Sequence, residues 1–515
     1  MKTLATSLVV YLSLLLDVAV VGVDGIRIHG KRKPWLDDPF SAVAREEGGG
    51  LQKRVPLSSD LKNVGDVNYF ANVTMGGRVF SALLDTGSSD LTVAGTVPNA
   101  KNTGKTATVN YAVGIAEGPI QTVQIQFEGF TIQDQAFISD TSGHHADGEG
   151  IIGLGPSSSS VVRDELANSG GNPVLDRIFR SNMSTPNFIT ILLGRSEDPT
   201  DPWPGDVTIG EILNDFENVT SQPKLAVTEV KTGNGQHWQA LLDPNGVIGP
   251  DGQPIKVSSK VKNSDKTRLN AVFDTGFSLS QVPKTIADAF YARVPGALYQ
   301  NISGIGEVYT LPCDVELNVT FKFGGVEYPV HPLDTSISTL KKKDALGNTF
   351  CIGSFQPIIS TAQASTYDMI LGMSFLRNAY MLVNFGDFVD GAASKTADPY
   401  IQLLPLTNDL AEAHYDFVKI RLDGIDNTAN FQLLPATTLP PTESTTPSDE
   451  ESFSEKIKPY LPYIIAGCAT AALILIVAIV FCIRSSRRKR YRRLHDPAPA
   501  GIEPPFAQYK PTRRY

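Results

Sequence analysis

The chain has 515 residues, of which 41% are apolar, so it is too long for one ordinary domain and apolar enough to build a core of one or two lobes. Its formal charge is -9, but residues 484–515 hold ten Lys/Arg and two Asp/Glu, which leaves about -17 for the rest. A charge this acidic excludes a protein that binds nucleic acid through a basic surface. It suits either a protein of an acidic compartment or an ordinary acidic ectodomain.

Two leader segments are expected before the globular part. Residues 1–24 carry one Lys and then an apolar run that ends in small residues, which is typical of a secretory signal peptide. Residues 25–54 are charged, contain Gly and end in Lys53-Arg54. We interpret them as a prosegment that is cut after the dibasic pair, with an unprocessed N-terminal tail as the alternative.

Short apolar runs rich in β-branched residues, separated by Gly, Asn and Pro, fill residues 55–430. Segments such as NYFANVTM, VFSALLD, TVQIQF and VTFKFGGVEYPV are typical of strands. Only residues 159–170 and 283–297 have the pattern of helices, the second opening with Pro283 in a first-turn position. The sequence therefore predicts an all-β fold with short helices.

The tripeptide Asp-Thr-Gly occurs twice, each time after an apolar pair: LLDTGSS contains Asp85 and VFDTGFS contains Asp274. Each copy is followed, later in the same half, by an apolar-apolar-Gly segment, which is GIIGLG at 150–155 and MILGMSF at 369–375. This repetition predicts two similar lobes, an N-terminal lobe over 55–224 and a C-terminal lobe over 225–430.

The paired motif permits a specific chemistry. Asp before Thr-Gly fits a strand that ends in a tight turn, where Gly87 and Gly276 allow a ligand to approach the backbone closely. If the two turns face each other, Asp85 and Asp274 cannot both ionise, and they share one proton. One carboxyl group would then deprotonate a water while the other protonates a carbonyl oxygen, which hydrolyses an amide without a covalent intermediate. A lone Asp would be a turn-capping residue, so the hypothesis depends on the pair.

On these residues the chain, from about Val67 to Leu406, resembles the pepsin-like aspartic endopeptidases. The resemblance implies a bilobal fold with Asp85 and Asp274 as the catalytic pair. It implies peptide or protein substrates, cut at apolar residues on either side of the scissile bond, with no cofactor and no metal.

The resemblance assigns further residues. NYAVGIAEGPI is similar to the family's flap, a hairpin that closes over the substrate, so Tyr111 is the flap tyrosine and Gly114, with the two motif glycines, is expected to contact substrate. Thr86 and Thr275 would brace the two turns against each other. Ser88 matches the residue that hydrogen-bonds the first Asp.

Two positions depart from the family pattern. Thr92 stands where many relatives have the Trp that tethers the flap tyrosine. Phe277 stands where relatives often have Thr or Ser, which removes a hydroxyl that could hydrogen-bond Asp274. We expect this loss to raise the working pH of the pair or to narrow the choice of substrate.

Cysteines and glycosylation acceptors indicate a lumenal or extracellular domain. Cys468 and Cys482 lie in an apolar segment near the C-terminus, which leaves Cys313 and Cys351 as an even pair in an oxidising compartment. One disulfide is expected, with two buried free thiols as the alternative. Five Asn-x-Ser/Thr acceptors predict glycosylation, at Asn72, Asn182, Asn218, Asn301 and Asn318.

The C-terminal part predicts a membrane anchor. Residues 431–460 are rich in Thr, Ser and Pro and resemble an extended stalk. Residues 461–483 carry no charge and are long enough to span a bilayer as a helix, and the basic tail at 484–515 places the C-terminus in the cytoplasm. The prediction is a single-pass type I protein with an extracellular or lumenal catalytic domain. A glycolipid-anchor signal would end at its apolar tail.

The function predicted from the sequence is a membrane-anchored aspartic endopeptidase, derived from a zymogen and acting as a monomer. The alternative is a catalytically impaired surface receptor or peptide-binding protein of the same fold, although both carboxylates and both Thr partners are intact. A two-carboxylate glycosidase could use a similar acid pair, but it would not explain the symmetric Thr-Gly turns.

Overall fold

The computed structural model describes residues 61–435 apart from 112–113, 182–185, 197, 200–202, 231–234, 303–304, 344–348, 359–365 and 387–397, and these residues belong to one compact unit. The predicted signal peptide, prosegment, membrane span and basic tail lie outside the described residues, as does the stalk beyond residue 435. Within the described part of the chain, no helix is long and apolar enough to cross a bilayer.

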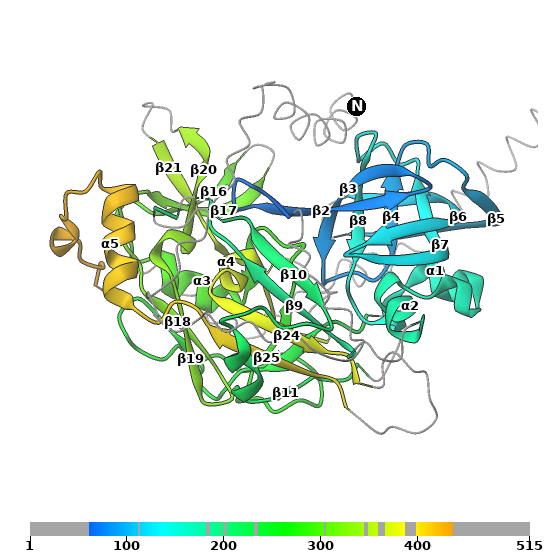
Figure 1. The fold of residues 1–515 in the computed structure, drawn as a ribbon. Helices are drawn as coiled ribbons and strands as arrows, with labels where there is room; N and C mark the ends of the chain where they lie inside the picture. The colour runs from blue at the N-terminus through cyan, green and yellow to red at the C-terminus, as the bar shows by residue number, and fades with distance from the viewer. Residues whose placement is uncertain are drawn as a thin grey trace, which may run out of the picture. The chain divides into compact units, whose positions relative to one another are not determined.

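The first half of the described chain forms an eight-stranded sheet of order β1-β2-β3-β8-β4-β7-β6-β5, in which β2 also pairs with β6 (Figure 1). Alternate residues of β2, such as Tyr69, Ala71 and Val73, are buried, so one face of the sheet covers the core. The helices α1 (Val161–Leu166) and α2 (Val174–Ser181) pack against β5 and β7. The strands are β1 (Lys62–Val64), β2 (Asn68–Met75), β3 (Arg78–Asp85), β4 (Leu91–Ala94), β5 (Lys101–Asn110), β6 (Ile115–Phe127), β7 (Phe130–Asp140) and β8 (Glu149–Gly153).

A five-stranded antiparallel sheet joins the two halves in the order β10-β9-β24-β25-β11 (Figure 1). Its strands come from distant parts of the chain. For example, β24 pairs with β9, and Val383 lies opposite Ile189. The late strands of the chain therefore return to its first half. The bounds are β9 (Phe188–Leu193), β10 (Gly205–Ile209), β11 (Leu225–Ala226), β24 (Ala379–Asn384) and β25 (Tyr400–Pro405).

The second half adds three smaller sheets, with orders β12-β14-β23-β15-β22, β13-β18-β19 and β16-β17-β21-β20. Its helices are α3 (Lys284–Tyr291), α4 (Met373–Leu376) and α5 (Leu410–Arg421). The strands are β12 (Gln239–Leu241), β13 (Val247–Ile248), β14 (Asn270–Phe273), β15 (Ser280–Val282), β16 (Leu298–Ile302), β17 (Gly306–Pro312), β18 (Val319–Phe323), β19 (Val326–Val330), β20 (Ser336–Lys343), β21 (Thr349–Gly353), β22 (Phe355–Pro357) and β23 (Met369–Leu371).

One four-strand arrangement occurs once in each half. β3, which ends at Asp85, runs parallel to β8; β8 pairs antiparallel with β4, and β4 runs parallel to β7. In the second half, β14, β23, β15 and β22 repeat this order and these directions. The apolar-apolar-Gly segments thus lie beside the strands that lead into the Asp-Thr-Gly turns, and the repeat in the sequence corresponds to a repeat in the structure.

The mostly β architecture agrees with the sequence prediction, but the helices differ in extent. The helix predicted over 159–170 is limited to α1, which ends where Ala167 takes a left-handed conformation with φ 51°. The helix predicted over 283–297 is limited to α3, with Pro283 just before its first residue. The helices α2, α4 and α5 were not predicted from the sequence.

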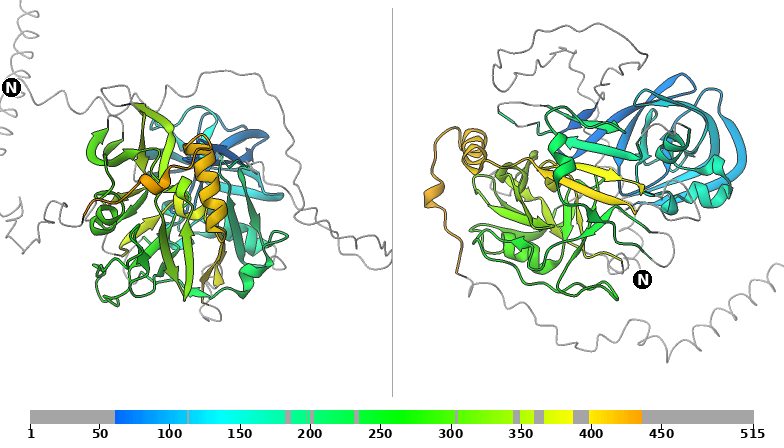
Figure 2. Two further views of the ribbon diagram at one scale, coloured as in Figure 1. Left: turned by 90° about the vertical axis from the view of Figure 1, so that its left-hand side faces the viewer. Right: turned by 60° about the horizontal axis from the view of Figure 1, so that its bottom comes forward.

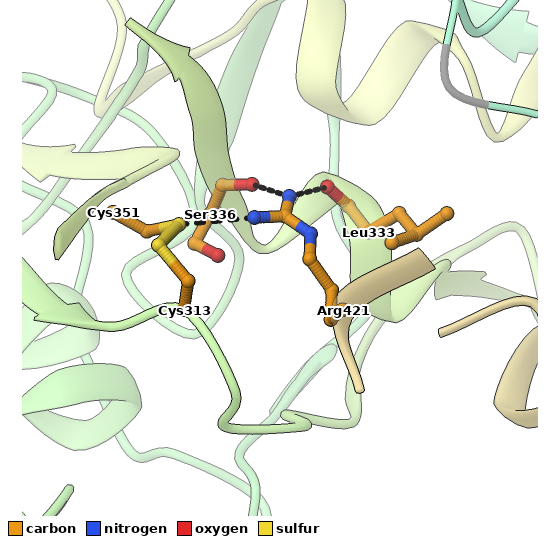
Figure 3. The surroundings of a disulfide bond; sticks show 5 residues. All are labelled: Cys313, Leu333, Ser336, Cys351 and Arg421. Atoms are coloured by element: carbon orange, nitrogen blue, oxygen red, sulfur yellow. Dashed lines mark hydrogen bonds between the residues drawn. A yellow bond between two sulfur atoms is a disulfide. The ribbon is translucent and has the colours of Figure 1, made fainter. Parts of the chain in front are cut away.

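α5 follows the last strand and packs against the 3₁₀ turn η5 (Pro332–Asp334), and it is drawn in orange in Figure 2. Its last residue, Arg421, donates hydrogen bonds to the carbonyl oxygens of Leu333 and Ser336 and to Sγ of Cys351, which forms a disulfide with Cys313 (Figure 3). The one disulfide expected from the sequence is therefore present, and the helix is attached beside it.

Candidate active site

Each Asp-Thr-Gly turn makes a backbone hydrogen bond to its neighbouring apolar-apolar-Gly segment, although the Asp accepts in one turn and donates in the other. The carbonyl of Asp85 accepts a hydrogen bond from the backbone N–H of Leu154 at 2.7 Å, and the N–H of Asp274 donates to the carbonyl of Leu371 at 3.0 Å. Both bonds join a turn to the neighbouring apolar-apolar-Gly segment. Both Asp residues are buried, with 6% and 7% of their surface exposed.

The two threonines of the motifs bind each other's turns reciprocally. The N–H of Thr86 donates to Oγ1 of Thr275 at 3.0 Å, and the N–H of Thr275 donates to Oγ1 of Thr86 at 3.0 Å. Each hydroxyl also donates across the interface, Thr86 to the carbonyl of Phe273 and Thr275 to that of Leu84. Both threonines are fully buried. This brace fixes the two turns face to face, as the resemblance implied.

The motif glycines let the carboxyl groups meet. A Cβ on Gly87 would overlap the carboxylate of Asp274. A Cβ on Gly276 would lie 2.5 Å from Oδ1 of Asp85 and 3.1 Å from Oδ1 of Asp274, so both carboxyl groups surround one point. Gly is therefore required here for close packing against the opposite Asp, in addition to any contact with a ligand.

The electrostatics of the pair are asymmetric. Burial, and then the nearby charge of Asp85, raise the pKa of Asp274 well above its usual value. Hydrogen bonds from the N–H groups of Gly276 and Gly87 lower this pKa, but their effect is smaller. Asp85 accepts hydrogen bonds from the Ser88 hydroxyl and, at 2.8 Å, from the N–H of Gly87. The raised pKa of Asp274 means that the pair can hold one shared proton.

Comparison with known proteins decides the family. Residues 68–394, more than half of the chain, match the family described as Eukaryotic aspartyl protease. The chain belongs to this aspartyl protease family. It is therefore a hydrolase that acts as an aspartic-type endopeptidase.

Its relatives include fungal proteins. Major aspartyl peptidase 1 of Cryptococcus neoformans var. grubii is 25% identical over 409 residues, which cover 72% of this chain and 78% of that protein. The aspartic-type endopeptidase ctsD of Aspergillus fumigatus is 23% identical over 383 residues, covering 70% and 72%. The crystal structure of an aspartic proteinase from Irpex lacteus shares the fold, with a TM-score of 0.51 and 17% identity over 67% of this chain and 97% of that one.

Tyr111, the predicted flap tyrosine of this aspartyl protease, lies beside the Thr92 hydroxyl of β4. The N–H of Tyr111 donates to the carbonyl of Gly114 at 3.1 Å, in a turn where Gly114 takes the left-handed φ of 82°. The hydroxyls of Tyr111 and Thr92 are sealed from solvent without a partner in hydrogen-bonding geometry among the described residues. Burial and the charge of Asp85 raise the pKa of Tyr111, and the Thr92 hydroxyl is near enough to lower it. Thr92, in β4, therefore lies beside Tyr111, the residue predicted to be the flap tyrosine.

The imidazole ring of His237 lies beside the first Asp-Thr-Gly turn of this aspartyl protease, and it was not predicted from the sequence. Nδ1 of His237 lies 3.1 Å from the carbonyl oxygen of Gly87, and its ring packs edge to face on Tyr367 with centroids 5.7 Å apart. No motif marks His237, because it is 150 residues from Gly87 in the sequence.

The predicted glycosylation acceptors of this aspartyl protease are exposed wherever the structure describes them. Asn72, Asn218, Asn301 and Asn318 are exposed, and Asn182 lies outside the described residues. Among the described residues there is no cluster of three or more His, Cys, Asp or Glu side chains that could hold a metal ion.

Proposed function

We propose that this enzyme hydrolyses peptide bonds with a water activated between Asp85 and Asp274. The observation that supports the proposal most strongly is the reciprocal brace between Thr86 and Thr275, because it holds two carboxyl groups from different lobes around one point. The raised pKa of Asp274 supports it further, since a shared proton supplies one acid and one base.

The first step forms a tetrahedral diol. Asp85 accepts a proton from the water as its oxygen attacks the carbonyl carbon, and Asp274 gives its proton to the carbonyl oxygen. In the second step Asp274 takes a proton back from one diol hydroxyl, Asp85 gives its proton to the amide nitrogen, and the C–N bond breaks. The products are a carboxylic acid and an amine, and the pair returns to one proton on Asp274.

We also propose that the enzyme is made as a zymogen and held in a membrane. The dibasic end of segment 25–54, the uncharged segment 461–483 and the basic tail support this topology. The exposure of the four described glycosylation acceptors agrees with a lumenal or extracellular domain. Cleavage after Arg54 is expected to increase activity, which a comparison of cleaved and uncleaved chain would measure.

The test is proteolysis by the full-length chain on a peptide library between pH 3 and 7, with and without pepstatin. We expect acid-dependent cleavage that pepstatin blocks and that Asp85→Asn abolishes, while the exposed control Asp147→Asn retains it. Pepstatin binding without turnover would instead support the receptor or peptide-binding alternative. Cleavage that persists in Asp85→Asn would contradict the mechanism.

A further inference from the structure

In the His237 ring, Nδ1 is hydrogen-bonded to the backbone and Nε2 is not hydrogen-bonded to a described residue. The Gly87 carbonyl can only accept a hydrogen bond, so Nδ1, 3.1 Å away, carries the proton. In the neutral ring Nε2 is then a lone-pair acceptor. Within the described residues Nε2 has no hydrogen-bond partner, and it is not among the unpartnered polar atoms that are sealed from solvent. The half-buried ring therefore presents an acceptor to solvent.

This acceptor lies beside the reacting groups. Gly87 is two residues from Asp85, and the charge of Asp85 reaches the His237 ring, where it opposes the lowering of the pKa by burial. The ring of Tyr367 packs against the imidazole of His237. Tyr367 also lies close enough to Asp274 for the charge of the Asp274 carboxylate to raise the pKa of Tyr367. Each ring therefore lies close enough to one carboxyl group to be affected by its charge, His237 to Asp85 and Tyr367 to Asp274. A peptide whose scissile bond contacts the carboxyl groups places a neighbouring residue within reach of His237, since consecutive residues are about 3.3 Å apart along an extended chain.

We propose that His237 is a specificity-determining residue, and that its Nε2 accepts a hydrogen bond from a donor-bearing substrate side chain, such as a carboxamide, next to the scissile bond. The inference rests on the proposed function. It adds a polar preference at one position, where the sequence predicted apolar residues on both sides of the bond.

The tautomer of His237 determines which substrate side chains are preferred. Nε2 of the neutral ring accepts but cannot donate, so it favours side chains that carry an N–H or O–H group over apolar side chains of the same size. Gln and Met form a suitable pair because they have similar length and volume. One neutral hydrogen bond changes an equilibrium by roughly three- to tenfold, which sets the expected size of the effect.

The experiment uses the full-length chain and a peptide of constant sequence, with Gln or Met at each of the four positions nearest the scissile bond. The ratio of kcat/KM for the Gln and Met peptides is measured for wild type, His237→Phe and His237→Asn. Phe keeps a ring against Tyr367, and Asn keeps an N–H donor for the Gly87 carbonyl. His414→Phe, on α5, is the control and should retain the wild-type ratio.

We expect the Gln/Met ratio at one position to fall roughly three- to tenfold in His237→Phe, which has no acceptor, and to fall less in His237→Asn, whose carboxamide oxygen can still accept. A ratio that does not change in His237→Phe, because both peptides lose kcat/KM equally, would overturn the proposal in favour of a structural role. Loss of the preference in Tyr367→Phe but not in His237→Phe would also overturn it, because the Tyr367 hydroxyl would then be the acceptor.

A binding measurement separates this inference from the proposed function. The dissociation constants of the same Gln and Met peptides are compared on the Asp85→Asn chain with and without His237→Phe. A ratio of dissociation constants that falls with His237→Phe supports the contact even if the wild-type chain shows no turnover. Equal ratios in the two chains contradict the contact even if turnover is present.

Discussion

Asp85 and Asp274 each accept a hydrogen bond from the N–H of their own motif glycine, but their side-chain neighbours differ. Ser88 donates its hydroxyl to Asp85, whereas the equivalent position in the second turn is Phe277, which packs with Val272, Tyr367 and Ile370. A hydroxyl donor favours the ionised carboxylate, and an apolar ring does not. This difference at one residue favours placing the shared proton on Asp274, whose pKa burial and the charge of Asp85 raise.

Replacing Phe277 with Ser should reduce the asymmetry. A hydroxyl donated to Asp274 stabilises its ionised form and lowers its pKa, so the alkaline limb of the kcat/KM profile should move to lower pH by about one unit. The measurement is kcat/KM against pH for wild type and Phe277→Ser. Phe277→Leu is the control, since it supplies no hydroxyl. An alkaline limb that stays at the wild-type pH would show that Phe277 does not set the proton distribution.

Gly87→Ala should disable the site without unfolding the protein. The new Cβ would overlap the Asp274 carboxylate, which has to move, and a displacement of about 1 Å at a catalytic group can reduce the rate on the order of 100-fold. Activity and melting temperature would be measured together. Gly249→Ala is the control, because its Cβ would meet its neighbours at an ordinary 3.4 Å. Full activity in Gly87→Ala would contradict the described packing.

At the scale of elements, α5 is attached to the second half of the chain by polar contacts. His414 pairs with Glu316 through Nδ1 at 2.8 Å and with Asp426 through Nε2 at 3.4 Å. The hydrogen bond that His414 donates to the Glu316 carboxylate raises the pKa of His414, and Asp426 adds to this effect. The helix is therefore expected to be held most firmly at acidic pH.

The sign of the pH effect follows from the raised pKa. His414 stabilises the docked helix fully below its ordinary pKa of 6.5, and this contribution is lost as the pH rises through the higher folded value. Hydrogen-exchange protection of α5 should therefore be greater at pH 6 than at pH 8.5. His414→Gln should remove this difference while α3 keeps its protection. Equal protection of α5 at the two pH values in the wild-type chain would contradict the account.

The sequence contained a signal for α5 that the strand-rich pattern obscured. Asp409 accepts hydrogen bonds from the N–H groups of Ala411 and Glu412, and Asp followed three residues later by Glu is a helix-start signal. α1 is similarly capped by Ser160. The ends of the helices were harder to predict. α1 ends at Ala167, which takes a left-handed conformation that Ala rarely adopts, so the sequence carries no signal for this end.

At the scale of the whole molecule, a buried charge cluster joins distant segments. Asp334 accepts hydrogen bonds from Nη2 of Arg195 and from Nε of Arg377, both at 2.6 Å, and from Asn378 at 2.9 Å. Arg377 also donates to the carbonyl of Asp66, near the start of the described chain. Burial alone would raise the pKa of Asp334, but the two arginines outweigh it and hold the pKa well below its usual range.

Asp334→Asn should cost roughly 3–5 kcal/mol of stability, because it leaves two buried guanidinium groups without their charge partner. The depressed pKa means that this stability is present above the unfolded value near 3.8 and is lost as the pH falls through the folded value. Urea unfolding should therefore show the largest gap from wild type at pH 5 and a smaller gap below pH 3.8. Asp147→Asn, which breaks an exposed pair with Arg78, should cost about 1 kcal/mol or less. A similar small cost for Asp334→Asn would contradict the role of the cluster.

The features that could be predicted from the sequence are repeated motifs or lie within a few residues of one another. Contacts between residues far apart in the sequence could not be predicted. The two Asp-Thr-Gly motifs, with Thr86 and Thr275, identified the centre of the site because each copy carries its chemistry within a few residues. His237 and the partners of Asp334 could not be predicted in this way. Arg195 lies 139 residues from Asp334, and only the sheet that joins the two halves brings them together.

The pH dependence of kcat/KM for the full-length chain on one peptide substrate tests the shared proton most directly. Because burial and Asp85 raise the pKa of Asp274, kcat/KM should follow a bell-shaped profile whose alkaline limb lies well above pH 3.8, and Asp274→Asn should lose cleavage at every pH. A profile that rises to a plateau through neutral pH, or cleavage that survives in Asp274→Asn, would contradict it.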